Sequence, residues 1–233
     1  MEIFAIILAR GGSVGIPKKN IYPINGFPLI AYTIQQCLDA GINKIYTSSD
    51  SDEILKIASF YGSKIIKRPY DFSLNESTSE EAWIHAINQI KDIDFDKDWI
   101  FAPQVTSPLR HKEDLNKAFR LASSEIYDSI FSVVKFEDFF LWDDDGKRLN
   151  SINYDYLNRK RRQELGTKTL LENGSFYMFK AKDIIKNNNR LSGKIGYIEM
   201  TKNKMYQIDS FEDIEIVEYF IDKYKLNKNI KKY

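Results

Sequence analysis

Residues 3–15 read IFAIILARGGSVG, a short apolar run that ends in a turn rich in glycine. A continuous apolar run of this length is typical of a parallel strand buried on both faces, and the glycines indicate a loop directly after it. Glycine lets the backbone of such a loop approach an anion closely and present N–H groups to it. This stretch therefore predicts the first central strand of an α/β sheet, followed by an anion-binding loop.

The first half of the chain continues with helical and strand-like segments in alternation. Helical spacing occurs in three segments, the third with an expected serine cap: residues 29–38, 52–61 and 79–90. Short strands are expected at three others: residues 44–47, 64–67 and 99–102. This alternation predicts a Rossmann-like α/β fold, with a mostly parallel sheet and helices on both faces. Because ligands bind at the carboxyl ends of parallel strands, the loops at 9–20, 48–50 and 103–110 are expected to be neighbours.

The second half departs from this pattern. A strand at 130–135 is followed by aromatic, acidic and basic residues, which we expect to form an inserted arm. Two further strands and a closing helix are expected: residues 175–179, 194–199 and 210–224. Ser210 is the expected N-cap of that helix, with Asp213 at its third position. The pattern predicts a single domain over residues 1–233, with the arm inserted at about 135–172.

Composition limits the classes of function. The chain has 34 Lys and Arg residues against 33 Asp and Glu residues, a formal net charge of +1, which does not indicate a nucleic-acid or membrane partner. Cys37 is the only cysteine, which rules out an intramolecular disulfide and a cysteine-built zinc site. The apolar run at residues 3–9 is too short for a signal peptide or a membrane span. We therefore expect a soluble, cytoplasmic protein with neither nucleic acid nor membrane as partner.

The glycine-rich loop carries positive charge at both ends. Arg10 and Lys19 flank its glycines, so the loop could hold a triphosphate. It is neither a Walker A loop, which ends in Gly-Lys-Ser/Thr, nor a G-x-G-x-x-G dinucleotide fingerprint. The alternative is a tight turn after a strand whose cations are merely solvated.

Three motifs together resemble those of a known family. The loop from Leu8 to Ile21 resembles the signature of the acylneuraminate cytidylyltransferases, also called CMP-sialic acid synthetases. Residues 104–110, which read QVTSPLR, are similar to the second motif of that family, and residues 161–163 with 172–177 resemble its third. The resemblance implies a nucleotidyltransferase that transfers CMP from CTP to the anomeric hydroxyl of a sialic-acid-like nonulosonic acid and releases pyrophosphate.

The resemblance also implies which residues form the site. The CTP-binding residues would be Ala9, Arg10, Gly11, Ser13, Lys19, Asn20, Arg68, Ser77, Ser79 and Gln104. The sugar-binding residues would be Gln104, Arg161, Gln163 and Tyr177. Arg10, Lys19, Arg161 and Arg162 would act catalytically by neutralising charge on the phosphates and the substrate carboxylate. Helix capping by the two serines, and a solvated basic face at 159–162, are the structural alternatives.

The metal motif departs from the family pattern. Its usual Asp-x-Asp is replaced by Gln207-Ile208-Asp209, which leaves Asp209 as the implied Mg²⁺ ligand, with Asp50 and Asp213 as compensating candidates. Mg²⁺ often uses one or two carboxylates together with waters and substrate phosphates, so a single carboxylate is compatible with it. If the side chain of residue 207 points inward, Gln207→Asp is expected to lower the Mg²⁺ requirement.

The resemblance further implies a homodimer in which the arm of one subunit covers the sugar site of the other. The motif at 173–177 and residues 131–134 favour a neuraminate-like acceptor, with legionaminic, pseudaminic or 3-deoxy-manno-octulosonic acid as alternatives. A nucleotide-binding protein that has lost its activity is the alternative from another class, suggested by Gln207 and by Val14, where the family often has lysine.

Overall fold

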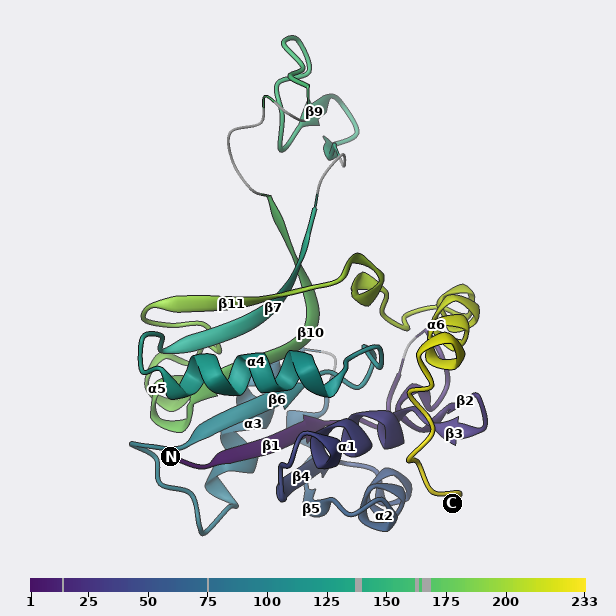
Figure 1. Cartoon of the computed structure of the whole chain (residues 1–233), viewed down its shortest axis with the longest axis vertical. Coiled ribbons are helices and arrows are strands. Elements are labelled where there is room, and N and C mark those ends of the chain that lie inside the picture. The colour runs from purple at the N-terminus through teal and green to yellow at the C-terminus, as the bar shows by residue number, and fades with distance from the viewer. Residues whose placement is uncertain (14, 75, 137–139, 162–163, 165–168) are drawn as a thin grey trace.

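A seven-stranded sheet forms the centre of the computed structural model, which describes all residues except 14, 75, 137–139, 162–163 and 165–168 (Figure 1). Its strands in chain order are β1 (Ile3–Leu8), β4 (Lys44–Ser49), β5 (Lys64–Lys67), β6 (Trp99–Pro103), β7 (Ser129–Lys135), β10 (Leu170–Lys180) and β11 (Ile195–Met200). Their order in the sheet is β11-β7-β10-β6-β1-β4-β5. Neighbouring strands are parallel except β10, which runs antiparallel to both β6 and β7. The predicted α/β fold with a mostly parallel sheet is confirmed.

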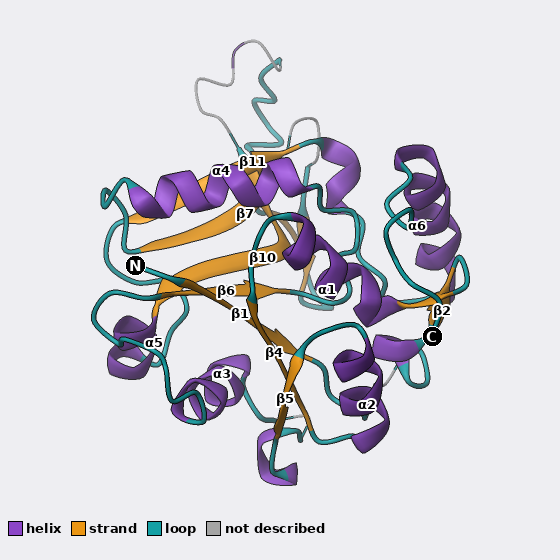
Figure 2. Ribbon diagram, turned by 60° about the horizontal axis from the view of Figure 1, so that its bottom comes forward, coloured by secondary structure: helices purple, strands orange, loops and turns teal. Residues whose placement is uncertain are grey.

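Helices cover both faces of the sheet, as Figure 2 shows. They are α1 (Leu29–Asp39), α2 (Asp52–Phe60), α3 (Ser79–Asn88), α4 (Lys112–Ser123) and α5 (Ala181–Asn187), whereas α6 (Phe211–Tyr224) lies to one side of the sheet. Successive side chains of a strand point to opposite faces, so β1 contributes to two cores. Ala5 and Ile7 pack in the cluster that includes α1 and α4, whereas Phe4 and Ile6 pack with α3 and α5. All four side chains are fully buried, as expected for a central strand.

Two helix starts test the expected caps. Ser210 caps α6 with Asp213 at the third position, as predicted. The serine cap expected for α3 is wrong, because Thr78 takes that place: its Oγ1 accepts from the backbone N–H of Glu81 at 3.2 Å. The Glu81 carboxylate in turn accepts from the backbone N–H of Thr78, which completes a capping box. Helices α4 and α5 were not expected from the sequence.

An arm projects from the sheet between β7 and β10 (Figure 1). These two strands pair as far as Lys135 and Leu170, and the described part of the arm beyond them contains the short hairpin β8 (Trp142–Asp144) and β9 (Leu149–Ser151). Several large apolar side chains of the arm are exposed: Leu141, Trp142, Leu149, Ile152 and Leu157. Among the described residues, no helix is long and apolar enough to cross a membrane.

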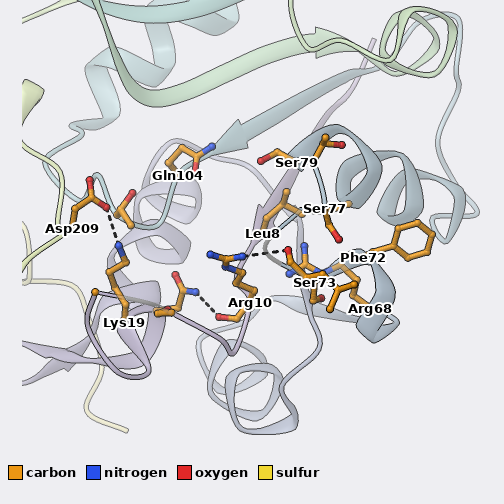
Figure 3. A pocket seen from close by; sticks show the side chains of 17 residues that line it. Leu8, Arg10, Lys19, Arg68, Phe72, Ser73, Ser77, Ser79, Gln104 and Asp209 are labelled. Carbon is orange, nitrogen blue, oxygen red and sulfur yellow. Dashed lines mark hydrogen bonds and ion pairs between the residues drawn. The ribbon is translucent and has the colours of Figure 1, made fainter. Parts of the chain in front are cut away.

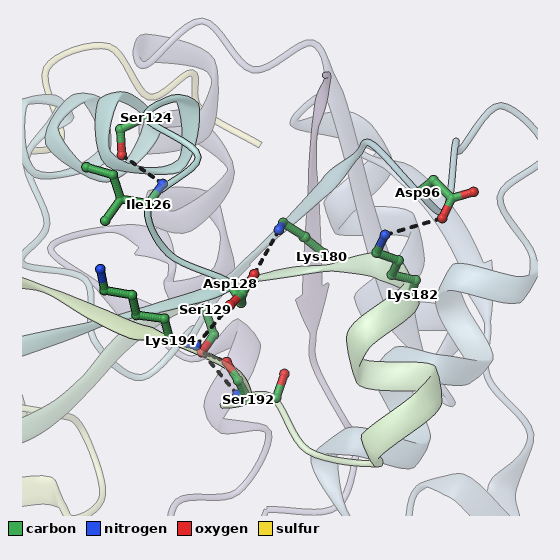
Figure 4. Close-up of polar contacts among 9 residues, drawn as sticks. All are labelled: Asp96, Ser124, Ile126, Asp128, Ser129, Lys180, Lys182, Ser192 and Lys194. Atoms are coloured by element: carbon green, nitrogen blue, oxygen red, sulfur yellow. Dashed lines mark hydrogen bonds and ion pairs between the residues drawn. The ribbon is translucent and has the colours of Figure 1, made fainter.

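The opposite end of this part of the sheet is fixed by Asp128 (Figure 4). Its carboxylate accepts from the Lys180 ammonium at 3.0 Å and from the backbone N–H of Lys194 at 2.9 Å. These hydrogen bonds, led by the one from Lys194, hold the pKa of Asp128 below its ordinary value. One side chain therefore connects the starts of β7 and β11 to the end of β10.

Candidate active site

A cavity of about 560 Å³ lies at the carboxyl ends of the central strands (Figure 3). It is lined by Leu8, Arg10, Ser13, Gly15, Lys19, Asn20, Arg68, Phe72, Ser73, Leu74, Ser77, Thr78, Ser79, Ala82, Gln104, Thr106 and Asp209. The loops expected to be neighbours meet here. The backbone N–H of Ala9 donates to Ser48 O at 3.1 Å, and that of Gly11 donates to Asp50 Oδ1 at 2.9 Å. Topology therefore brings the three loop regions to one site.

The glycine-rich loop is held in shape by its own polar residues. Asn20 is buried, and its amide donates to Arg10 O at 2.9 Å. Gly15 lies directly against Asp209, because a Cβ at that position would come within 2.5 Å of Asp209 O. Only glycine permits this approach without a shift of backbone. The loop and the C-terminal motif therefore form one wall of the cavity.

This wall carries two cations and one carboxylate: Arg10, Lys19 and Asp209. Lys19 Nζ lies 2.9 Å from Asp209 Oδ1, with 16% of the lysine side chain and 71% of the aspartate side chain exposed. Arg10 Nη1 donates to Leu74 O at 3.3 Å. Both cations line the cavity, so it offers concentrated positive charge to an anionic ligand.

Arg68 and the serines form the opposite wall. Arg68 is 4% exposed, and burial lowers the pKa of its guanidinium. Its Nε has no hydrogen-bond partner among the described residues. Ser77 donates its hydroxyl to Asp71 O at 2.7 Å, and Ser79 is the first residue of α3. Since Thr78 is the cap, the alternative that these serines act as caps is wrong.

Gln104 follows β6 and reaches the cavity from its sheet side. Its backbone N–H donates to Ser175 O at 3.0 Å, while its side chain lines the cavity. The position is fixed by Arg110, which donates to both Gln104 O and Ser175 O at 2.8 and 2.7 Å. Arg110 is 1% exposed, and burial lowers the pKa of its guanidinium to about 10. No role was assigned to Arg110 from the sequence, although it ends the second motif.

Some of the expected site residues do not line this cavity. Ala9 is fully buried beneath it. Tyr177 is buried on the sheet, with its ring against Trp83 and its hydroxyl donating to Glu172 Oε1. Burial, and then this hydrogen bond, raise the pKa of Tyr177 to about 12.

The basic cluster of the third motif is on the arm. Arg161 is exposed there, and its backbone N–H donates to Glu164 Oε2 at 3.0 Å. Arg161 does not line the cavity of its own chain. Arg162 and Gln163 lie outside the described residues.

Among the described residues, one carboxylate lines the cavity at the candidate metal site, that of Asp209. Gln207 does not line the cavity, and its Nε2 donates to Asn173 O at 2.8 Å, so the premise that its side chain points inward is wrong. Asp50 accepts from Gly11, and Asp213 Oδ2 accepts from the backbone N–H groups of Asp209 and Ser210 at 2.9 and 2.8 Å. Although burial opposes it, these backbone hydrogen bonds lower the pKa of Asp213.

The remaining donor set suits only some metals. In the described part of the chain, no group of three or more His, Cys, Asp or Glu side chains could hold a metal ion. A single exposed carboxylate fits a Mg²⁺ ion that is held mainly by waters and substrate phosphates, but it does not fit a metal enclosed by protein ligands.

Comparison with known proteins agrees with this geometry. A family model described as cytidylyltransferase matches residues 4–218. The chain is 37% identical over 219 residues to N-acylneuraminate cytidylyltransferase A of Danio rerio, covering 92% of this chain and 49% of that protein. It thus spans about half the length of such relatives. It is also 29% identical over 234 residues to pseudaminic acid cytidylyltransferase of Campylobacter jejuni, with 97% and 98% covered.

Solved structures show the same fold. CMP:2-keto-3-deoxy-manno-octonic acid synthetase complexed with CTP matches with a TM-score of 0.71 at 14% identity, over 96% of this chain and all of that one. A 4-diphosphocytidyl-2C-methyl-D-erythritol synthase matches with a TM-score of 0.68 at 11% identity, over 95% and 99%. Given a family model that spans most of its length, and a first and second motif that converge on one cavity, this chain belongs to the cytidylyltransferase family.

Proposed function

We propose that the chain transfers CMP from CTP to the anomeric hydroxyl of a nonulosonic acid and releases pyrophosphate. The observation that carries the proposal is the cavity itself, in which Arg10, Lys19 and Asp209 lie on one wall and Arg68 and Gln104 on others. The first three suit a triphosphate with a divalent cation. The last two offer a cation and an amide to a base or a ribose, and an amide can pair with the donor and acceptors of cytosine. The names of the relatives support the same reaction.

The proposed reaction is a direct displacement at the α-phosphorus. The oxygen of the anomeric hydroxyl forms the new bond to phosphorus, the bond to the bridging oxygen breaks, and pyrophosphate leaves with that electron pair. The hydroxyl proton goes to solvent, since the cavity lining among the described residues contains no histidine and its one carboxylate is paired with Lys19. Arg10 and Lys19 neutralise the charge that develops on the leaving group, and the contacts of the loop with Asn20 and Asp209 help to position them.

Mg²⁺ is the cofactor that we propose for this reaction. Asp209 would hold it together with waters and the phosphates of CTP, because Mg²⁺ keeps several waters and needs few protein ligands. When bound, the ion supplies positive charge to the phosphates. The Lys19–Asp209 ion pair must then open, or be shared with the ion, as the nucleotide binds.

The acceptor is proposed to be an N-acylneuraminate-like acid, after the Danio rerio relatives with the higher identity. A pseudaminic acid is the second candidate, because the relative named for it matches over nearly its entire length. Gln104 is the proposed acceptor contact from the body of the chain, together with Gln163 from the arm, whereas Tyr177 is buried and does not line the cavity.

The arm is proposed to complete the acceptor site of a second copy. Arg161 is exposed and does not line the cavity of its own chain, and the arm presents apolar side chains that a partner would bury. A C₂ homodimer in which each arm reaches the other cavity accounts for both features. Arg161 and Arg162 would then bind the carboxylate of the acceptor and the pyrophosphate through two-pronged hydrogen bonds. The compartment that we propose is the cytoplasm, where CTP is available.

Pyrophosphate release from CTP with a panel of sugar acids tests the proposal. The panel contains N-acetylneuraminic, legionaminic, pseudaminic and 3-deoxy-manno-octulosonic acids, and the preferred acid should give a CMP-sugar in equal amount to the pyrophosphate. CTP should exceed ATP, GTP and UTP, because a site that buries polar groups penalises a base that leaves them unpaired. Binding of CTP without pyrophosphate release for any acid would favour an inactive nucleotide-binding protein instead.

A further inference from the structure

Gln207 occupies the place where the resembled metal motif carries a carboxylate, and the structure gives it a different task. Its Nε2 donates to Asn173 O at 2.8 Å. The amide also lies against Gly174, where an added Cβ would come within 2.8 Å of Gln207 Nε2. Gly174 has a φ of 60°, a conformation that favours glycine. The side chain is therefore fitted to the backbone of β10 and not to the cavity.

The contact point on β10 is itself firmly held. Asn173 is 1% exposed, and its side-chain amide donates to Lys204 O at 2.9 Å. Lys204 in turn forms an ion pair with Asp114 of α4, in which both side chains are buried. The segment before residue 207 is thus fixed to two elements of the body, so Gln207 bridges between ordered parts of the chain.

Asp209 lies only two residues beyond Gln207, and the backbone around it is held at several points. The intervening backbone N–H of Ile208 donates to Thr106 O at 2.8 Å. On the other side, Gly15 lies directly against the carbonyl of Asp209. The hydrogen bond from Gln207 to Asn173 O is thus one of the contacts that set the path of the backbone carrying the carboxylate that faces Lys19.

The same short segment of β10 supports both ends of the cavity. Ser175 O accepts from the backbone N–H of Gln104 at 3.0 Å, two residues along the chain from the carbonyl that accepts from Gln207. This segment coincides with the irregularity in the pairing of β10 with β7, between Glu172 and Tyr177. Gln104 and Asp209 are thus positioned from one piece of backbone, at the strand by which the arm returns to the sheet.

We propose that Gln207 is a positioning residue whose neutral amide, through Asn173 O, holds the Asp209 carboxylate opposite Lys19. The inference rests on the proposed function, since the task of Asp209 is binding CTP with its cation. A hydrogen-bond donor is required at this position, because its partner is a carbonyl oxygen. A carboxylate there would repel the carbonyl. The amide of Gln207 therefore has a positioning role of its own and is not simply what remains after the loss of a metal ligand.

Gln207→Glu tests this directly, because it keeps the size of the side chain and replaces the donor by an acceptor. At about pH 8 the variant should have roughly a tenfold lower kcat/KM for CTP than wild type, and CTP should bind more weakly, as expected when a hydrogen bond becomes a repulsion. The Mg²⁺ concentration for half-maximal activity should rise in the same variant, because Asp209 is the carboxylate proposed to hold the ion. Gln35→Glu is the matched control, since the Gln35 amide donates to Asp39 far from the cavity, and it should keep the kcat/KM and the Mg²⁺ requirement of wild type.

Calorimetric binding of CTP with Mg²⁺, without a sugar acid, provides a readout that does not depend on turnover. A Gln207→Glu variant that binds CTP and turns over like wild type at about pH 8 would overturn the inference, as would a deficit in turnover with unchanged CTP binding and unchanged Mg²⁺ requirement. If this variant does not fold, Gln207→Met takes its place, and it should show the same loss; full activity of that variant would also overturn the inference. A wild type that releases no pyrophosphate with any sugar acid would refute the proposed function alone, because the comparison of CTP binding would still decide the role of Gln207.

Discussion

Lys19 Nζ lies 2.9 Å from Asp209 Oδ1, and this ion pair joins the two ends of the chain across the mouth of the cavity. The lysine begins a short 3₁₀ helix, Lys19–Ile21, that follows the glycine-rich loop, and the aspartate lies in the segment before the last helix. The pair forms because the glycine at position 15 lets the loop contact the backbone of Asp209.

The two adjacent lysines of this loop offer a matched comparison. Lys19→Ala should lower turnover by about a hundredfold, the usual effect of removing one charge-stabilising group. Lys18→Ala should change it by less than about twofold, because Lys18 forms an exposed ion pair with Glu53 and does not line the cavity. Steady-state kinetics with circular dichroism as the fold control would measure both. Equal effects would mean that the loop charges act only on the fold.

We expect each active site of the proposed dimer to need Arg10 from one subunit and Arg161 from the other. Each alanine variant alone should lose about a hundredfold in turnover. If the arm reaches the partner, one site of each mixed dimer regains both arginines, so an equal mixture should recover about a quarter of wild-type activity. The variants would be mixed under conditions that allow exchange of subunits and then assayed. A mixture no more active than its components would place both arginines in the same subunit's site.

We expect Arg110 to stabilise the fold through the hydrogen bonds that its guanidinium donates. Its guanidinium donates to two backbone carbonyls, to Gln36 Oε1 at 3.0 Å and to Thr33 Oγ1 at 2.8 Å. Arg110→Met would remove these four hydrogen bonds from the core, at a cost on the order of 3 kcal/mol in the free energy of unfolding. Urea denaturation would measure the change. Arg120→Met, on the exposed face of α4, should stay within about 0.5 kcal/mol of wild type.

Asp128 should make stability sensitive to acid. Because its pKa is lowered in the folded chain, its contribution is complete above the pKa of the unfolded chain and is lost as the pH falls through the folded value. Asp128→Asn should therefore reduce the free energy of unfolding at about pH 7, and the difference from wild type should shrink below about pH 4. Thermal or urea unfolding at several pH values would follow this difference. Asp143→Asn, at an exposed position of β8, is the control for removal of a surface carboxylate.

Much of this molecule could be predicted from local patterns. The apolar run of β1, the alternation after it and the capping residues Ser210 and Asp213 are short-range signals, and the structure confirms them. The prediction of a serine cap for α3 is wrong, although Glu81 stands three residues after Thr78 in the spacing of a capping box. Helix α4 also had a readable signal, since Leu115, Ala118 and Ala122 fall on one helical face.

The site could be predicted only in part, because some contacts depend on the tertiary fold. Convergence of the Arg10 loop, Gln104 and Asp209 follows from the rule that ligands bind at the carboxyl ends of parallel strands. The direction of Gln207 does not follow from any pattern, since its partner is a backbone carbonyl on a strand 34 residues earlier. The arginines of the arm illustrate the same limit, because the course of an arm depends on packing and not on the sequence near it.

The reversed direction of β10 has a consequence for how this family can diversify. Because β10 runs antiparallel to β7, the chain leaves the sheet after Lys135 and re-enters it at Leu170, at the same end of the two strands. The segment between these points can change in length or in sequence without changing the path of the chain through the core. If the arm contacts the acceptor as proposed, recognition of the acceptor can diverge while the nucleotide cavity stays unchanged, which fits relatives named for different sugar acids.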